Sequence, residues 1–331
     1  VPETVSGFYQ DVRKGVPQPN TFTGSTPLAT LLHRRCGHVS WGSRHICRAM
    51  EEAYGKAFDR SKSCFCPFCV KAKMTKRHRS LPGTRKATRP LERVHFDVVF
   101  GIPVQGVGGH RGFLLMVDEF TDKVFIYLLR AKSEVASKLR LFHQEAERHF
   151  QHPVGTYLVP FTLTAFRSDN AKENISSEVQ GWLTDLGVRH ELSTPYSQWQ
   201  DGKAERFIRI VWEGSEAIRK ATGAPDRLWP FSLRTFVHVH ARLPRRTTVS
   251  PWEAWWGVQV PLKKRIQHLR AWGCRAYFMI PKERRQKLDD KAVECLFLGY
   301  SSNSKAYVGL DLSTGYILTS TSVIFDETRS E

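Results

Sequence analysis

The stretch between positions 166 and 210 limits what this chain can fold into more than any other part of the sequence. It holds two acids, Asp169 in FRSDNAKEN and Glu205 in QDGKAERFIRI, with thirty-five residues between them. Asp169 follows an alternating apolar run, which predicts the C-terminal tip of a strand over 161–168. Glu205 lies near the start of a segment, 203–221, whose apolar residues recur on one face of a helix. The stretch therefore predicts one acid at a strand end and another at a helix start.

A third acid, Asp97, lies inside a strand-like run, RVHFDVVF. Two acids on strands and one at a helix start can point into one pocket, where three carboxylates repel each other unless cations neutralise them. Hard oxygen ligands of this kind suit Mg²⁺. Each acid alone is weak support, because an aspartate at a strand end is usually a solvated cap or turn residue. Asp118 in LLMVDEF is expected to be such a residue.

The contexts and the spacing of the acids, taken together, resemble a known family. The segments VHFDVVFG, FRSDNAKEN and PYSQWQDGKAERFIR resemble the D,D(35)E core of retroviral-type integrases, most closely the integrases within the Gag-Pol polyproteins of copia-type long-terminal-repeat retrotransposons. The resemblance extends from about Leu31 to Glu327. It implies an α/β fold: an RNase H-like mixed-sheet core, preceded by a small helical HHCC zinc domain and followed by a small SH3-like β domain.

The same resemblance implies a reaction and its site. Asp97, Asp169 and Glu205 would be both the catalytic residues and the ligands of two Mg²⁺ or Mn²⁺ ions, with Asp97 bridging the pair. Two such ions hold the attacking and leaving oxygens of a phosphodiester in line. The nucleophile would be water when a DNA 3′ end is trimmed and a 3′-hydroxyl when that end is joined to target DNA. The implied partners are double-stranded DNA and further copies of the chain, acting in the nucleus after assembly in cytoplasmic virus-like particles.

The composition agrees with an anionic partner. The 50 basic and 32 acidic residues leave a net charge of +18, and the pI is near 9.8. Nucleic acid and an acidic membrane surface both fit this charge. No apolar run approaches the roughly 18 residues of a membrane span, and no stretch has the layout of a signal peptide. Nucleic acid is therefore the expected partner.

Histidines and cysteines in the first part of the chain have the spacing of a zinc site. The predicted ligands are His33, His38, Cys66 and Cys69, which form His-x₄-His and Cys-x₂-Cys pairs. Structural Zn²⁺ takes four such ligands in a closed tetrahedron, one pair here expected from a helix and the other from a loop. Cys64 competes with Cys66 as a ligand, but Cys64-x-Cys66 would make a cramped chelate. So short a domain needs the metal to be stable.

The expected segments follow from these features. They are a flexible lead-in over 1–30, the zinc domain over 31–76, a basic linker over 77–90, the core over 91–257, a second basic linker over 258–268 and the β domain over 269–327. In the core, periodicity predicts strands over 93–99, 112–119, 123–129, 161–168 and 188–192, and helices over 133–150, 175–186, 203–221 and 229–242.

Candidate DNA contacts come from the core and from the first linker. Lys203 and Arg209 are expected to hold a DNA phosphate near the metals, and Tyr196 and Gln198 to contact the DNA end or the target. The linker candidates are Lys73, Lys76 and Arg77.

Two residues depart from the family pattern: Ala171 replaces a usual Gly, and Asp201 replaces a usual Asn. Neither removes one of the three acids. The alternative reading is a catalytically impaired, zinc-dependent DNA-binding or assembly subunit. A plain RNase H-like nuclease is a third reading, but it explains the acids without explaining the zinc and β domains.

Overall fold

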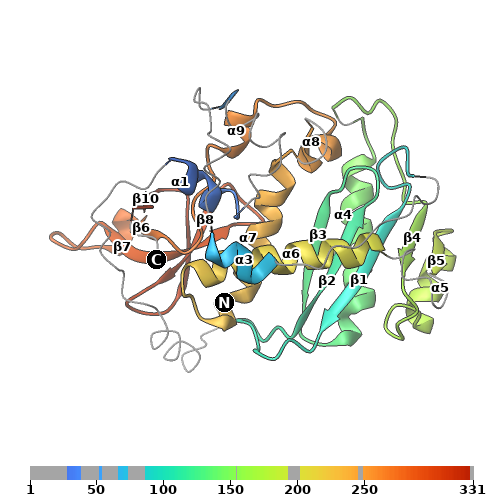
Figure 1. The fold of residues 1–331 in the computed structure, drawn as a ribbon, viewed down its shortest axis with the longest axis horizontal. Coiled ribbons are helices and arrows are strands. Elements are labelled where there is room, and N and C mark those ends of the chain that lie inside the picture. Colours follow the sequence, from blue (N-terminus) through green and yellow to red (C-terminus); the bar gives the residue numbers. More distant parts are fainter. Residues whose placement is uncertain are drawn as a thin grey trace.

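The computed structural model describes residues 28–38, 52–53, 66–73, 86–153, 155–192, 202–244 and 249–328. Figure 1 shows a mixed sheet with helices on both faces on one side of the molecule and a second, antiparallel sheet on the other. Two long helices lie between the sheets. Within the described residues, none of the helices is both long enough and apolar enough to cross a membrane.

The first sheet has the strand order β3-β2-β1-β4-β5. Its strands are β1 (Val94–Phe100), β2 (Gly112–Asp118), β3 (Val124–Leu129), β4 (Ala165–Ser168) and β5 (Arg189–Leu192). The first three strands pair antiparallel, whereas β4 and β5 continue the sheet in parallel from β1. β4 runs beside the first half of β1, since Val94 pairs with Phe166 and His95 with Arg167.

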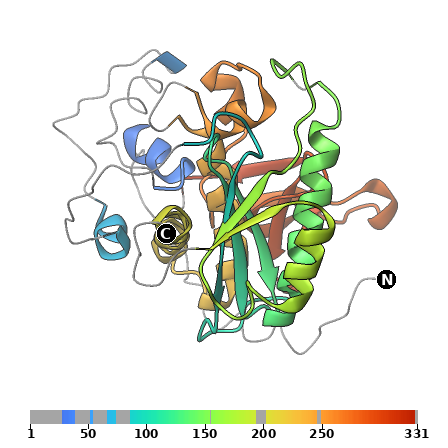
Figure 2. The same ribbon diagram turned by 90° about the vertical axis from the view of Figure 1, so that its right-hand side faces the viewer.

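Helices cover both faces of this sheet. They are α4 (Val135–Phe150) and α5 (Ser177–Asp185) on one face and α6 (Gly202–Ala221) and α7 (Trp229–Arg242) on the other, as Figure 2 shows. Strand β2 is buried along its whole length because its side chains alternate between the two layers. Phe113, Leu115 and Val117 pack with α6 and α7, and Leu114 and Met116 pack with α4 and α5. The expected mixed α/β core is confirmed.

The second sheet has the order β10-β6-β7-β8-β9, with antiparallel pairing throughout. Its strands are β6 (Arg275–Met279), β7 (Ala292–Tyr300), β8 (Tyr307–Asp311), β9 (Ile317–Ser320) and β10 (Val323–Asp326). It packs against α7, because Trp272, Leu296 and Leu298 join the same buried cluster as Leu233 and Phe236. The expected small β domain is therefore present and is docked on the core.

Shorter elements complete the part of the chain that the structure describes. They are α1 (Leu28–Arg35), α3 (Pro67–Lys73), α8 (Pro251–Trp256), α9 (Leu262–Ile266) and three single turns of 3₁₀ helix, Lys132–Glu134, Asp226–Leu228 and Lys282–Arg284. α3 lies along α6 in both ribbon views. Cys36, just after α1, is buried among Val239, Leu243, Ile266 and Leu269.

One strand is shorter than its sequence pattern predicts. The pattern indicates a strand over 161–168, but β4 begins at Ala165. The backbone N–H of Phe161 donates to the carbonyl of Phe150, and that of Thr164 donates to Leu91. The alternating apolar residues before Ala165 therefore pack on the core from a loop rather than from a ladder.

Candidate functional site

Two of the three predicted acids come from neighbouring parallel strands. Asp97 lies in the middle of β1, and Asp169 directly follows the last residue of β4. His95 of β1 pairs in parallel with Arg167 of β4, and Asp97 lies two residues beyond His95 on the face of the sheet that carries α6. Asp97 accepts a hydrogen bond from the backbone N–H of Val98 at 2.7 Å.

The carboxylate of Asp169 is oriented by its own loop. Its Oδ1 accepts from the backbone N–H of Ala171 at 3.0 Å and from Nδ2 of the fully buried Asn174 at 2.7 Å. Ala171 is not among the described residues with positive φ. Alanine therefore fits this position without backbone strain, although the family pattern has glycine there.

The third acid lies in the first turn of α6. Glu205 is exposed there, while the neighbouring Ala204 and Phe207 are buried against the core. Arg209 follows one turn later and is also exposed. Asp97, Asp169 and Glu205 do not form a tight cluster: among the described residues, no group of metal-ligating side chains other than the His-Cys set below is close enough to share one ion.

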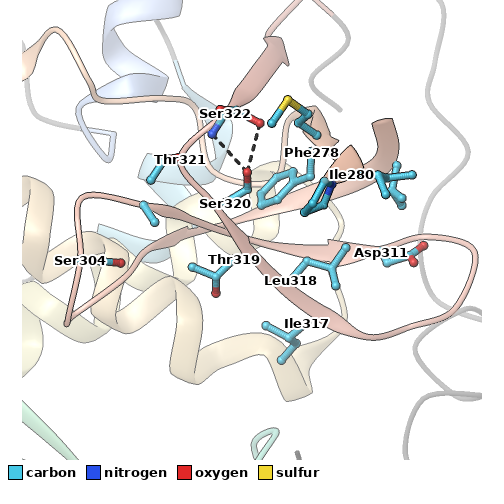
Figure 3. A pocket seen from close by; sticks show the side chains of 14 residues that line it. Phe278, Ile280, Ser304, Asp311, Ile317, Leu318, Thr319, Ser320, Thr321 and Ser322 are labelled. Carbon is cyan, nitrogen blue, oxygen red and sulfur yellow. Dashed lines mark hydrogen bonds between the residues drawn. The ribbon is translucent and has the colours of Figure 1, made fainter. Parts of the chain in front are cut away.

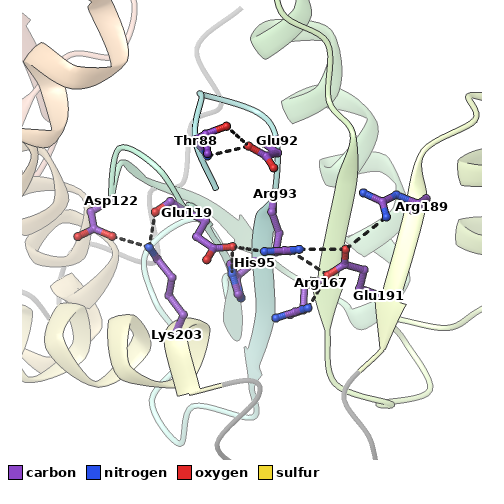
Figure 4. Close-up of polar contacts among 10 residues, drawn as sticks. All are labelled: Thr88, Glu92, Arg93, His95, Glu119, Asp122, Arg167, Arg189, Glu191 and Lys203. Carbon is purple, nitrogen blue, oxygen red and sulfur yellow. Dashed lines mark hydrogen bonds and ion pairs between the residues drawn. The ribbon is translucent and has the colours of Figure 1, made fainter. Parts of the chain in front are cut away.

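Lys203 has partners inside the protein. Its Nζ donates to the carbonyl oxygen of Glu119 at 2.7 Å and to Oδ1 of Asp122 at 2.6 Å. Glu119 in turn contacts Arg93 and His95, and Arg93 contacts Glu191 on β5 (Figure 4). No local sequence pattern predicts these pairings, because their members are distant in the chain.

Asp118 differs from the solvated turn residue expected from the sequence. It is fully buried at the end of β2. Its carboxylate accepts from the backbone N–H groups of Leu91 and Thr121 and from the Thr121 hydroxyl, at 2.7–2.9 Å. Burial raises the pKa of Asp118, and these hydrogen bonds oppose that rise. The residue is a buried cap of the β2–β3 turn, so the expectation of solvation was wrong.

The predicted zinc ligands converge. His33 lies in the last turn of α1, and a left-handed turn at Gly37 (φ 63°) and His38 (φ 57°) brings the two imidazoles to a ring separation of 4.7 Å. Cys66 directly precedes α3 and Cys69 lies in its first turn. The helix and loop roles thus differ from expectation, since His38 lies beyond its helix and Cys69 lies on one.

The distances within this set suit a tetrahedral zinc ion. The ligand atoms of the four residues all lie within 4.8 Å of one another. The Sγ···N distances are 3.3 Å from Cys66 to His38 Nδ1, and 3.4 and 3.6 Å from Cys69 to His33 Nε2 and His38 Nδ1. Zn–S and Zn–N bonds of about 2.3 and 2.05 Å at a tetrahedral angle imply about 3.5 Å between such atoms.

The electrostatics of the set also suit a metal. Burial, with the nearby His33, Lys73 and Arg34, holds the pKa of His38 well below its ordinary value, so its lone pair is available. Burial raises the pKa of Cys69 to about 12, so its thiol keeps its proton until a metal displaces it. The competitor Cys64 lies outside the described residues.

Of the remaining predicted DNA contacts, only Lys73 lies within the described residues. Lys73 Nζ donates to the carbonyl oxygen of His38 at 2.6 Å and lies over the ring of Phe236. Lys73 therefore links the zinc set to α7. The other candidates, Tyr196, Gln198, Lys76 and Arg77, lie outside the described residues, as does Asp201.

A cavity of about 740 Å³ opens in the second sheet, between the end of β6 and the β9–β10 bend (Figure 3). Apolar side chains such as Phe278 and Leu318 line it together with the hydroxyl groups of Thr319 and Ser322. All of its lining residues belong to this β domain, so the cavity is separate from the three acids.

Comparisons with known proteins agree with this architecture. Residues 87–198 match the family described as integrase core domain, and residues 274–331 match the retroviral polymerase SH3-like domain. The retrovirus-related Pol polyprotein from transposon TNT 1-94 of Nicotiana tabacum is 28% identical over 302 residues, which is 90% of this chain and 22% of that protein. The Pol polyproteins from transposons RE2 and RE1 of Arabidopsis thaliana are 30% and 31% identical over 246 residues, 74% of this chain and 16% of each protein.

The chain thus spans about a fifth of the length of these relatives. Among solved structures, the cryo-electron microscopy structure of the simian T-cell lymphotropic virus intasome in complex with a PP2A regulatory subunit matches with a TM-score of 0.39 and 15% identity. That match covers 73% of this chain and 84% of the other.

Proposed function

We propose that this chain, which carries an integrase core domain at residues 87–198 and a retroviral SH3-like domain at residues 274–331, is the integrase segment of a retrotransposon Pol polyprotein. Its reaction would be DNA strand transfer, in which the 3′-hydroxyl of an element's cDNA end attacks a target phosphodiester. Trimming of that 3′ end by water is the same chemistry with another nucleophile.

The observation that carries the proposal is the position of Asp97 and Asp169 on adjacent parallel strands, Asp97 within β1 and Asp169 directly after β4. Integrase core domains use divalent metals, and hard carboxylate oxygens at one sheet edge are the ligands that Mg²⁺ or Mn²⁺ prefer. Glu205, exposed in the first turn of α6, would complete the set. When bound, two such ions would supply positive charge for the oxygens that gain negative charge in the transition state.

The chain's own residues would prepare this site and bring DNA to it. Asn174 and the backbone of Ala171 fix the orientation of the Asp169 carboxylate. Arg209 extends from α6 one turn beyond Glu205, where a guanidinium can hold a phosphate. The net charge of +18 supplies affinity that a small acidic pocket lacks. Lys76, Arg77, Tyr196 and Gln198 stay candidates for the same DNA footprint.

Assembly and location are further parts of the proposal. Joining both ends of one cDNA needs more than one active site, so a homo-oligomer on double-stranded DNA is expected. The zinc set would hold the N-terminal module in its folded form. The place of action would be the nucleus, after assembly in cytoplasmic virus-like particles.

A strand-transfer assay tests the catalytic assignment. Glu205→Gln and Asp169→Asn keep the side-chain shape and remove one ligand charge each. Each should reduce joining of a labelled duplex end to target DNA by at least about 100-fold, because a transition-state contribution of about 3 kcal/mol corresponds to that factor. Folding and salt-dependent DNA binding should be largely retained.

Glu213→Gln is the matched control, since it makes the same chemical change two turns further along α6. It should leave joining within about twofold of wild type. If both site variants join DNA as well as wild type, the site assignment is wrong. If folded wild-type protein is inactive on its cognate ends, the chain is the catalytically impaired DNA-binding or assembly subunit instead.

A further inference from the structure

An ionic network lies on the same sheet face as the three acids. It joins β1, β4, β5, the β2–β3 turn and the start of α6, as Figure 4 shows. Its members are Arg93, His95, Glu119, Asp122, Arg167, Glu191 and Lys203. All of these side chains are partly or largely shielded from solvent, with exposed fractions between 4% and 29%.

The network adjoins the acids in the register of the sheet. His95, Arg167 and Glu191 occupy one row across β1, β4 and β5, since His95 pairs with Arg167 and Arg167 with Glu191. Asp97 lies two residues further along β1 on the same face, and Asp169 directly follows the end of β4. The ionic row therefore adjoins the backbone that carries the two carboxylates.

The network also holds both ends of the segment that leads to Glu205. At one end, Glu191 of β5 accepts from Arg93 Nε at 2.8 Å and from Arg167 at 2.5 Å. At the other end, Lys203 donates to the Glu119 carbonyl and to Asp122. Glu119 connects the two ends, because its carboxylate accepts a hydrogen bond from Arg93 at 2.9 Å. The first turn of α6 is thus tied to the same arginine as the end of β5.

These contacts are better explained by geometry than by stability. Replacing a whole buried ion pair by apolar residues is often neutral for stability, because desolvation offsets most of the attraction, although removing one partner alone is costly. A role in fixing one arrangement is the best-supported use of such pairs. Lys203 lies two residues before Glu205, and its ammonium group donates two hydrogen bonds to the β2–β3 turn. That ammonium group fixes where the helix begins.

We infer that Lys203, with Glu119 and Asp122 as its receptor, is a positioning residue that sets Glu205 against Asp97 and Asp169, rather than a contact to DNA phosphate. The inference rests on the proposed function and assigns part of its site. It predicts that loosening the first turn of α6 weakens binding of a divalent cation at the three acids, while leaving metal-free DNA binding unchanged.

The test is the affinity of zinc-loaded protein for Mn²⁺, measured by calorimetry, with Glu205→Gln as the reference for a lost ligand. Lys203→Met should weaken Mn²⁺ binding about tenfold, as loss of an outer partner of a metal ligand does. The direction is diagnostic, because removing a positive charge near the site would by electrostatics alone strengthen cation binding. Asp122→Asn should also weaken it, and asparagine suits the left-handed backbone at this position (φ 58°).

Lys220→Met is the matched control: it removes an ion-paired lysine at the far end of the same helix, and it should leave the Mn²⁺ affinity unchanged. Should Lys203→Met fail to fold, Lys203→Gln takes its place with the same expected direction. Suppose that Glu205→Gln binds Mn²⁺ more weakly than wild type, while the folded Lys203 variant binds it as tightly or more tightly. That result contradicts this inference alone. If Glu205→Gln binds Mn²⁺ as tightly as wild type does, the proposed function and the inference are both contradicted.

The rival role of Lys203, a DNA phosphate contact, has a separate signature. Losing one phosphate contact lowers the slope of log affinity against log salt by about 0.9. We expect the slope for Lys203→Met, measured without divalent metal, to equal that of wild type. A slope reduced by one contact overturns the positioning role.

Discussion

At the scale of single residues, Glu119 shows how neighbouring groups lower the pKa of a half-buried acid. Burial raises its pKa, but hydrogen bonds from His95 and Arg93 outweigh burial and lower it to about 2. An acid with a folded pKa below its ordinary 4.5 stabilises the fold above about pH 4.5, and that contribution is lost as the pH falls toward 2. Glu119→Gln should therefore lower the free energy of unfolding by about 3 kcal/mol at pH 7.

The difference in the free energy of unfolding between wild type and Glu119→Gln should be about 1 kcal/mol smaller at pH 3.5 than at pH 7. The reason is that Glu119 of the unfolded wild-type chain takes up a proton in this range. Urea unfolding at the two pH values measures it. Glu178→Gln, at an exposed pair with Arg140, should show a small gap at both. A Glu119→Gln gap that stays constant with pH would mean that this carboxylate is not held by cations.

Which site residues the sequence can predict depends on where their partners lie. His33, His38, Cys66 and Cys69 were predicted because ligand type and short spacing restrict what they can do, and the structure brings them together. Asp118 was misread as solvated, because its partner Leu91 is 27 residues away and no local pattern reveals the contact. The hydrogen-bond partners of Lys203 were missed for the same reason, since they lie 81 to 84 residues earlier.

At the scale of elements, periodicity predicted the long elements and failed where the backbone finds partners outside a ladder. The helix expected over 203–221 is observed as α6 over Gly202–Ala221. The strand expected over 161–168 shrinks to four residues, because the backbone N–H groups of Phe161 and Thr164 donate to the carbonyls of Phe150 and Leu91 instead. Side-chain alternation alone does not distinguish a strand from an extended loop packed on the same core.

The helices α1 and α3 are the elements that should depend most on metal. They meet mainly through the His-Cys set, and Lys73 at the end of α3 reaches the His38 carbonyl and the Phe236 ring of α7. Removing zinc with a chelator should therefore release α3 from α6, because the energy of metal binding is part of the folding energy of so small a module. Hydrogen exchange should become faster in α1 and α3, and on the side of α6 that α3 covers.

The β1–β2 ladder is the internal control for that experiment, since its amides belong to the buried core and should keep their protection. Cys69→Ser should reproduce the effect of the chelator without any reagent. Exchange in α3 that does not respond to the chelator or to this substitution would show that packing alone holds the module.

At the scale of the whole molecule, the two ends of the described chain meet. Arg35, the last residue of α1, donates from Nε to both carboxylate oxygens of Glu327 at 2.9 and 3.0 Å, and Glu327 follows β10. Glu327 is largely buried and also accepts from the backbone N–H of Ala271 at 2.8 Å. The module that carries the His-Cys set and the second sheet are thus joined directly within one chain.

This junction yields a test of whether the parts act as one body. Arg35→Ala removes the guanidinium that pairs with the buried Glu327 carboxylate, and Glu327→Gln removes the charge of that carboxylate. Each should lower the thermal midpoint, and the double variant should cost less than the two added together, because side chains in contact are coupled by about 0.5–3 kcal/mol. A double-mutant cycle on zinc-loaded protein measures that coupling. Arg275→Ala with Glu294→Gln is a comparison pair inside the second sheet whose carboxylate is more exposed, 39% against 8% for Glu327. It should show less coupling, as solvent-accessible pairs contribute about 0–1 kcal/mol. Effects of the Arg35 and Glu327 variants that simply add would mean that the module is held to the second sheet by apolar packing around Cys36, and that the ion pair forms only as a consequence.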